Sequence, residues 1–206
     1  MISRRAFAAY LAGGAAVASA LLLPGWWQIS GPGAAPPLPR LPLPLGEMSF
    51  SMQDHTGAEV SPQGLVGKPS LVFFGYTFCP DVCPTTLSDI STWLSGLGAD
   101  AARLNAVFIT VDPGRDTLPA MAQYMQHFHP AISGWRGSLA ETDKAVAGFR
   151  ASYTLGEGAE GEGADYAVEH TSSVFLFKAD GRLAALIDLH EDRAQAVAKI
   201  QRVLQR

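Results

Sequence analysis

Two uninterrupted apolar runs in the middle of the chain constrain its fold more than any other feature. Residues 70–76 read S-L-V-F-F-G-Y and residues 106–111 read A-V-F-I-T-V, with no alternation of polar and apolar positions. Runs of this length that are apolar at nearly every position are typical of strands buried on both faces, as in a parallel sheet. Such a sheet needs helices to cover its faces, so these runs predict an α/β domain.

The rest of the chain supplies the elements that such a domain requires. Helices are predicted at 85–97, 117–128, 140–153 and 191–205, and further strands at 48–53, 59–60, 172–178 and 182–189. The Asp180-Gly181 pair is a two-residue turn typical of a hairpin. The order β-α-β-α followed by β-β-α, with cysteines after the first core strand, predicts a thioredoxin-like fold with a central mixed sheet flanked by helices.

The first thirty residues are expected to form a membrane anchor. Ala6 to Leu23 carries no charge, and eighteen helical residues span about 27 Å, the thickness of a hydrocarbon core. Arg4 and Arg5 precede this run and favour a cytoplasmic N-terminus. We therefore expect a single N-terminal span in a bacterial inner membrane, with the domain on the periplasmic side. The alternative is a cleaved, twin-arginine-like export signal.

A proline-rich linker separates this segment from the folded domain. Residues 31–45 hold six prolines, a composition that favours extended polyproline II structure. Residues 46–206 remain for one domain. The formal net charge is −4 and no run of basic residues is present, so we expect no nucleic-acid partner.

The chain has only two cysteines, Cys79 and Cys83, four residues apart. Two neighbouring cysteines are too few for a disulfide scaffold and indicate a redox pair or metal ligands. Pro80 and Pro84 follow them, which predicts a stiff loop and a helix that begins near Pro84. The positive end of that helix is expected to lower the pKa of Cys83, and thiolates are soft ligands that select Cu(I).

Other polar residues complete the predicted site. His170 precedes the strand at 172–178, and we expect its loop to face the cysteines and supply an imidazole as third donor. Asp81 lies between the cysteines and either reaches the metal or caps the helix. Asp116 is expected to cap the next helix or to pair with Arg115, and Thr117 is predicted as the cap of that helix.

Three segments resemble the signature segments of the Sco/SenC copper proteins, in the same order: T-F-C-P-D-V-C-P-T-T-L, V-D-P-G-R-D-T and V-E-H-T-S-S-V-F-L-F. The resemblance implies a copper chaperone for the copper (CuA) site of cytochrome c oxidase, with oxidase subunit II and other copper carriers as partners. It implies one copper, Cu(I) or Cu(II), bound by Cys79, Cys83 and His170, with Asp112 nearby assisting Cu(II). Many members carry His where Phe78 stands, a departure that removes no ligand.

Thiol chemistry is the main alternative. Cys79 and Cys83 could instead be the redox pair of a dedicated thiol–disulfide oxidoreductase that reduces the cysteines of the oxidase copper site. The usual thioredoxin apparatus is C-x-x-C with a facing cis-proline, whereas this chain has C-x-x-x-C and no proline near Thr171. The chain does not fit a peroxiredoxin, whose motif is P-x-x-x-T-x-x-C, because Val72 stands at the position of the proline in that motif. A metal-free redox sensor would leave His170 without a role. The sequence thus identifies no certain catalytic residue.

Overall fold

The computed structural model describes residues 41–159, 166–189 and 191–205. The predicted anchor and most of the predicted linker lie outside these residues. Leu41–Arg206 forms one compact unit. Within the described part of the chain, every helix is too short or too polar to cross a bilayer.

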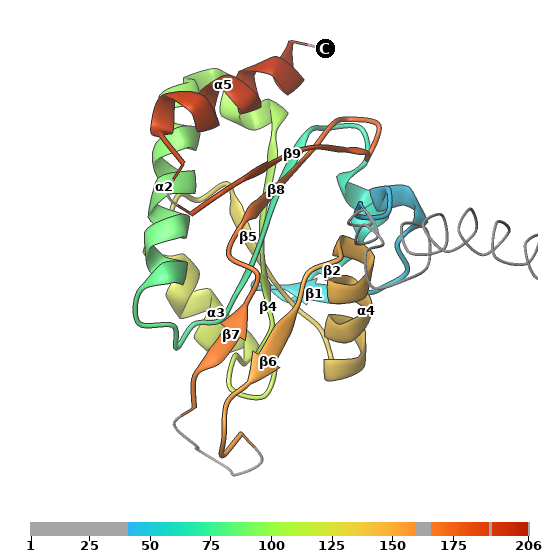
Figure 1. Ribbon diagram of the computed structural model, residues 1–206, viewed down its shortest axis with the longest axis vertical. Helices are drawn as coiled ribbons and strands as arrows, with labels where there is room; N and C mark the ends of the chain where they lie inside the picture. Colours follow the sequence, from blue (N-terminus) through green and yellow to red (C-terminus); the bar gives the residue numbers. More distant parts are fainter. Residues whose placement is uncertain (1–40, 160–165, 190, 206) are drawn as a thin grey trace, which may run out of the picture. The chain divides into compact units, whose positions relative to one another are not determined.

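The core of the domain is a seven-stranded mixed sheet with the order β2-β1-β5-β4-β3-β8-β9 (Figure 1). Its strands are β1 (Met52–Asp54), β2 (Glu59–Val60), β3 (Ser70–Gly75), β4 (Asn105–Thr110), β5 (Ile132–Arg136), β8 (Val174–Phe177) and β9 (Leu183–Ile187). The strands β3, β4 and β5 run parallel, whereas β8 pairs antiparallel with β3. The predicted α/β fold with a central mixed sheet is confirmed.

Helices cover the sheet on both sides (Figure 1). They are α2 (Val82–Leu97), α3 (Leu118–Met125), α4 (Leu139–Phe149) and α5 (Arg193–Leu204), with 3-10 turns η1 (Leu45–Glu47), η2 (Pro62–Leu65) and η3 (Gly98–Arg103). Every residue of β3 is buried. On one face Phe73 meets Phe108 of β4, and on the other Phe74 meets Phe149 of α4 with ring centroids 5.1 Å apart. Burial on both faces explains why the apolar run of β3 does not alternate.

Three parts of the fold differ from the sequence prediction. The strand β5 was not predicted. Its Gly134 lets α3 pack closely, because a Cβ there would lie 2.9 Å from side-chain atoms of Met121 and Met125. The helix predicted at 140–153 ends earlier, because Arg150 adopts a left-handed conformation with φ of 55°. The chain then forms β6 (Tyr153–Leu155), which pairs with β7 (Val168–His170) in a separate two-stranded sheet. Residue 170 therefore lies on a strand and not in a loop.

Candidate metal centre

Three metal-ligating side chains meet at the carboxyl end of β3. Cys79 lies in the loop after β3, Cys83 lies in the first turn of α2, and His170 ends β7. Their ligand atoms all lie within 4.8 Å of one another. Two ligands bound to one metal at about 2.3 Å each lie at most about 4.6 Å apart, so small side-chain rotations suffice to enclose an ion. Among the described residues, this is the only group of three or more His, Cys, Asp or Glu side chains so arranged.

The loop between the cysteines brings their sulfurs together. The Cys79 N–H donates to the carbonyl of Tyr76 at 3.3 Å, which turns the chain after β3. The Cys83 N–H then donates to the Cys79 Sγ at 3.4 Å. Pro84 is tolerated because the first turn of a helix does not need its N–H. Cys83 is fully buried and Cys79 is partly exposed, so the pair is reached from the side of Cys79.

A glycine of β3 makes room for the buried sulfur. A Cβ on Gly75 would lie 2.8 Å from the Cys83 Sγ and 2.8 Å from the ring of Phe108. Both distances are below van der Waals contact, so a larger residue would displace the sulfur or the ring. Sequence reasoning did not single out Gly75. A glycine inside an otherwise apolar strand is the signal that could have found it, because it marks a close approach to the backbone.

The imidazole of His170 is held in one tautomer. Its Nδ1 lies 3.0 Å from the carbonyl oxygen of Thr171, which can only accept, so Nδ1 carries the proton of the neutral ring. The lone pair of Nε2 is then directed at the Cys83 Sγ, 3.3 Å away. Burial lowers the pKa of His170 and so favours the neutral form that binds metals. A carbonyl that fixes the far nitrogen is a usual feature of metal-binding histidines.

The prediction of a lowered thiol pKa at Cys83 is wrong. Cys83 does lie in the first turn of α2, where the helix dipole favours an anion. Burial nevertheless raises the pKa of the Cys83 thiol, because loss of hydration disfavours the thiolate. A metal ion bound here would therefore have to displace a proton from sulfur.

Tyr76 connects the two halves of the site. Its hydroxyl accepts a hydrogen bond from the Val168 N–H at 3.3 Å, which ties the end of β3 to β7. The rings of Tyr76 and Phe73 both pack edge-on against His170, each with centroids 6.0 Å from the imidazole. These contacts fix the position of β7 as well as the ring plane of His170. The sequence analysis did not assign a role to Tyr76.

Asp112 lies in a neighbouring network of charged and aromatic groups. Its carboxylate accepts from Arg115 Nε at 2.5 Å and from the Tyr166 hydroxyl at 2.7 Å, and only 2% of the residue is exposed. The Arg115 guanidinium in turn lies over the Tyr166 ring, 3.5 Å from its centroid, and 5.0 Å from that of Phe78. The group of three donors does not include Asp112. Its predicted assistance to Cu(II) stays a prediction.

Asp81 occupies the N-cap position of α2. It makes no side-chain capping hydrogen bond, it is exposed, and it is not part of the group of three donors. The predicted helix cap is thus not formed by its side chain, and its alternative role as a carboxylate that reaches the metal stays a prediction.

The prediction for Asp116 is wrong, whereas that for Thr117 is confirmed. Asp116 neither caps α3 nor pairs with Arg115, because it turns inward and is fully buried. Its carboxylate accepts from the backbone N–H and hydroxyl of Thr77 and from the hydroxyl of Thr110. Burial raises its pKa. Thr117 caps α3 by accepting from the Ala120 N–H.

Comparison with known proteins identifies relatives of this domain. The family model SCO1/SenC matches residues 43–205. A mouse protein described as "Protein SCO2 homolog, mitochondrial" is 35% identical over 160 residues, which cover 77% of this chain and 62% of the mouse protein. The human "Protein SCO1 homolog, mitochondrial" is 32% identical over 76% of this chain and 52% of its own length. This chain thus spans less than two thirds of either relative.

Solved structures with the same fold include two that hold copper. The copper-bound ScoI of Bradyrhizobium japonicum is 37% identical with a TM-score of 0.70, covering 80% of this chain and 99% of that one. Copper-bound yeast Sco1 is 30% identical with a TM-score of 0.72, covering 81% of this chain and 90% of that one.

Proposed function

This chain belongs to the SCO1/SenC family, and from that premise we propose that it is a copper metallochaperone. It binds one copper ion through Cys79, Cys83 and His170 and serves the assembly of the copper site of cytochrome c oxidase. One observation carries the proposal: two thiols and an imidazole Nε2 with a fixed tautomer lie within 4.8 Å of one another. The copper bound by the relatives named above supports the choice of metal.

The donor set suits copper in both oxidation states. Two thiolates are soft ligands and favour Cu(I), whereas an imidazole nitrogen suits Cu(II) as well. The neutral His170 ring needs no proton loss at Nε2 to bind, and Cys79 is the sulfur that incoming copper reaches first because Cys83 is fully buried. Asp112 is proposed to assist the binding of Cu(II).

The same proposal includes a location. Residues 1–30 anchor the chain in a bacterial inner membrane, and the linker at 31–45 carries the domain on the periplasmic side. Oxidase subunit II is the proposed client, and other copper carriers are the proposed donors. A bilayer-bound chaperone would remain close to a bilayer-bound client.

A second function rests on the distance between the two sulfurs. The Cys79 and Cys83 sulfurs lie within 4.8 Å of each other, and a movement of the partly exposed Cys79 would join them in a disulfide. As a thiol–disulfide oxidoreductase, the pair would give two electrons and two protons to a client disulfide. The client would leave with two thiols, and Cys79 and Cys83 would form a disulfide. The imidazole at Cys83 favours the copper function, because thiol exchange needs no third metal ligand.

Copper titration of the reduced full-length protein tests the proposal. We expect one tightly bound Cu(I) per chain in competition with a chromophoric chelator, and loss of that equivalent in the Cys79→Ala/Cys83→Ala double variant. His170→Ala should weaken Cu(II) binding by more than it weakens Cu(I) binding. His127→Ala is the matched control, because His127 is an exposed histidine outside the donor group.

Two outcomes separate the functions. Retention of a full copper equivalent by the double cysteine variant would rule out the metal centre. Normal oxidase assembly in cells that carry His170→Ala, with Cu(II) binding lost, would instead favour the reductase.

A further inference from the structure

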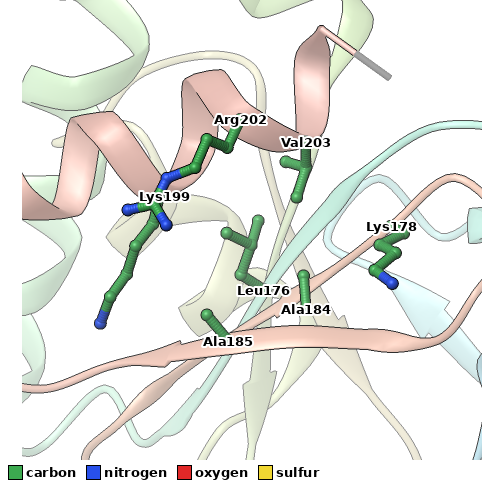
Figure 2. Close-up of a pocket in the computed structure, with 7 residues that line it drawn as sticks. All are labelled: Leu176, Lys178, Ala184, Ala185, Lys199, Arg202 and Val203. Carbon is green, nitrogen blue, oxygen red and sulfur yellow. The ribbon is translucent and has the colours of Figure 1, made fainter.

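Basic side chains gather around two hollows at the end of the domain opposite the metal centre, although the domain as a whole is acidic. Arg4, Arg5 and Arg40 precede the domain, and all nineteen acidic residues lie within it. The domain therefore has twelve basic and nineteen acidic residues. Two neighbouring surface hollows, both lined by Val203, are lined by five of these twelve basic residues. Lys178, Lys199 and Arg202 line the first, shown in Figure 2, and Lys68 and Arg103 line the second. Among the described residues, no carboxylate side chain lines either hollow.

Three of these five residues have no ion-pair partner among the described residues. Arg103 pairs with Asp100 and Lys199 with Glu191. Lys68 instead donates to the carbonyl of Ala102 and Arg202 to that of Ala198. Lys178 projects from the end of β8 on the far side of the hollow from α5 (Figure 2). We call the surface formed by Lys68, Arg103, Lys178, Lys199 and Arg202 the basic face.

The basic face and the metal centre lie at opposite ends of β3. Lys68 comes just before β3, whereas Cys79 follows it. Phe177 pairs with Ser70, so Lys178 lies at the same end as Lys68. Six strand residues separate the two ends by about 17 Å. In Figure 1 α5 and the turn between β8 and β9 lie at the upper end of the domain, and β6 and β7 at the lower end.

The first described residues run from the end of α4, where the Leu43 N–H donates to the carbonyl of Gly148, to the turn between β8 and β9. The Leu45 N–H donates to the carbonyl of Gly181, in the turn between β8 and β9, at 2.8 Å. Gly67, beside Lys68, donates to the carbonyl of Ala179 in that turn. Val66 is 45% exposed and lies against Gly181, so an apolar side chain also faces outward here. Forty residues precede Leu41, and among them is the predicted anchor.

From this placement we infer that the basic face binds the anionic phospholipid headgroups of the membrane in which the chain is anchored. The inference rests on the anchor proposed above. Cationic side chains attract anionic lipid, and an exposed apolar residue beside them can enter the interface. With the basic face on the bilayer, Cys79 and His170 point away from it. The domain would present its copper to a client from the aqueous side and would not lie freely at the end of its linker.

Lysine footprinting of the full-length protein in vesicles tests this orientation. The domain has four lysines, of which Lys68, Lys178 and Lys199 belong to the basic face, and Lys144 of α4 is a built-in control. Acetylation by an amine-reactive ester is followed by mass spectrometry in phosphatidylcholine vesicles and in vesicles with one quarter phosphatidylglycerol. We expect Lys68 and Lys178 to react about fivefold more slowly with the anionic lipid. Lys199 should be slowed by less, because its amine already pairs with Glu191. The protection should disappear in high salt, and Lys144 should not change.

Variants that replace lysine with uncharged glutamine provide a second test of the same orientation. Lys68→Gln/Lys178→Gln should remove the lipid-dependent protection of Lys199, whereas Lys144→Gln should leave it unchanged. Equal rates at Lys68 and Lys178 in both lipids, or equal slowing at Lys144, would overturn the inference. Flotation with neutral vesicles tests the anchor separately. If the chain does not float with neutral vesicles, the anchor is wrong, and flotation with the anionic vesicles then decides the basic face by itself.

Discussion

Two polar clusters lie at the carboxyl ends of β3 and β4, and they use their lone pairs in opposite ways. In the donor group, His170 Nε2 and the sulfurs of Cys79 and Cys83 lie against one another. In the buried carboxylate of Asp116, both oxygens accept hydrogen bonds from Thr77 and Thr110. Burial alone therefore does not mark a binding site. In the donor group the lone pairs converge on the other donor atoms, whereas the structural carboxylate has its lone pairs filled by hydroxyl and N–H groups of the fold.

Changes in the Asp116 cluster are therefore expected to lower stability, whereas changes in the donor group are expected to lower copper affinity. Asp116→Asn replaces one accepting oxygen by an NH₂ group that faces the donors of Thr77 or Thr110. Leaving buried donors unsatisfied costs about 1–3 kcal/mol each, so we expect the free energy of unfolding to fall by about 3 kcal/mol. Copper stoichiometry of the folded fraction should stay at one. Urea unfolding of the copper-free protein measures the loss.

Asp100→Asn is the control for Asp116→Asn, because Asp100 is exposed and pairs only with the equally exposed Arg103. We expect its unfolding free energy to change by less than about 0.5 kcal/mol. If Asp116→Asn unfolds like the wild type and loses copper instead, Asp116 belongs to the metal centre and the contrast between the clusters disappears.

Gly75→Ala should damage stability and copper binding together. The added methyl group would lie 2.8 Å from both the Cys83 Sγ and the Phe108 ring. Overpacking of a buried site costs about 1–3 kcal/mol, and we expect about 2 kcal/mol here. Displacement of the sulfur should weaken Cu(I) binding at least about tenfold, which is about 1.4 kcal/mol. Chelator competition and urea unfolding on the same variant measure both effects.

Gly96→Ala is the matched control, because nothing lies within 4 Å of a Cβ at Gly96 in α2. Alanine in a helix interior is more favourable than glycine by about 1 kcal/mol, so this variant should gain stability and bind copper normally. Wild-type copper affinity in Gly75→Ala would mean that the Cys83 sulfur can move without consequence.

The sequence was sufficient where one physical signal dominated. The strand β3 was predicted because its burial on both faces leaves an uninterrupted apolar run, and Cys79 and Cys83 were predicted because they are the only two cysteines and lie four residues apart. β5 was missed because its five residues include Ser133 and Gly134, so neither an apolar run nor an alternation stands out. β6 and β7 were missed because each has only three residues.

Tertiary contacts overrode local signals within the site. Asp116 precedes the capping residue Thr117 and so suggested a role at the helix end, but Thr77 and Thr110 supply donors from distant parts of the chain and turn it inward. Cys83 lies where a helix dipole favours a thiolate, but full burial has the larger effect on its pKa. Neither outcome is visible without the packing around these side chains.

Tyr76→Phe removes one link between the end of β3 and β7. The Val168 N–H would lose the hydroxyl that accepts its hydrogen bond, and the ring that packs on His170 would remain. A buried hydrogen bond contributes about 1 kcal/mol, so we expect a loss of about that size and a few-fold weaker copper binding. Tyr153→Phe is the control, because that hydroxyl donates to Asp143 at the surface. A larger loss in Tyr153→Phe than in Tyr76→Phe would contradict the assigned link.

The smallest effect is expected at Phe78, the residue just before Cys79. Phe78 is 60% exposed, and its main contact is the Arg115 guanidinium, 5.0 Å from the ring centroid. An exposed cation–π contact contributes about 0.5–1 kcal/mol, so Phe78→Ala should cost no more than that. Copper affinity should stay within about twofold of the wild type, because the donors Cys79, Cys83 and His170 form a complete set without residue 78.

Phe78→His separates packing from ligation, because it keeps a planar ring near Arg115 and adds a nitrogen beside Cys79. If Phe78→His binds Cu(II) more than about tenfold tighter while Phe78→Ala does not, a nitrogen at residue 78 can act as a fourth ligand, and the three-donor centre is incomplete for Cu(II).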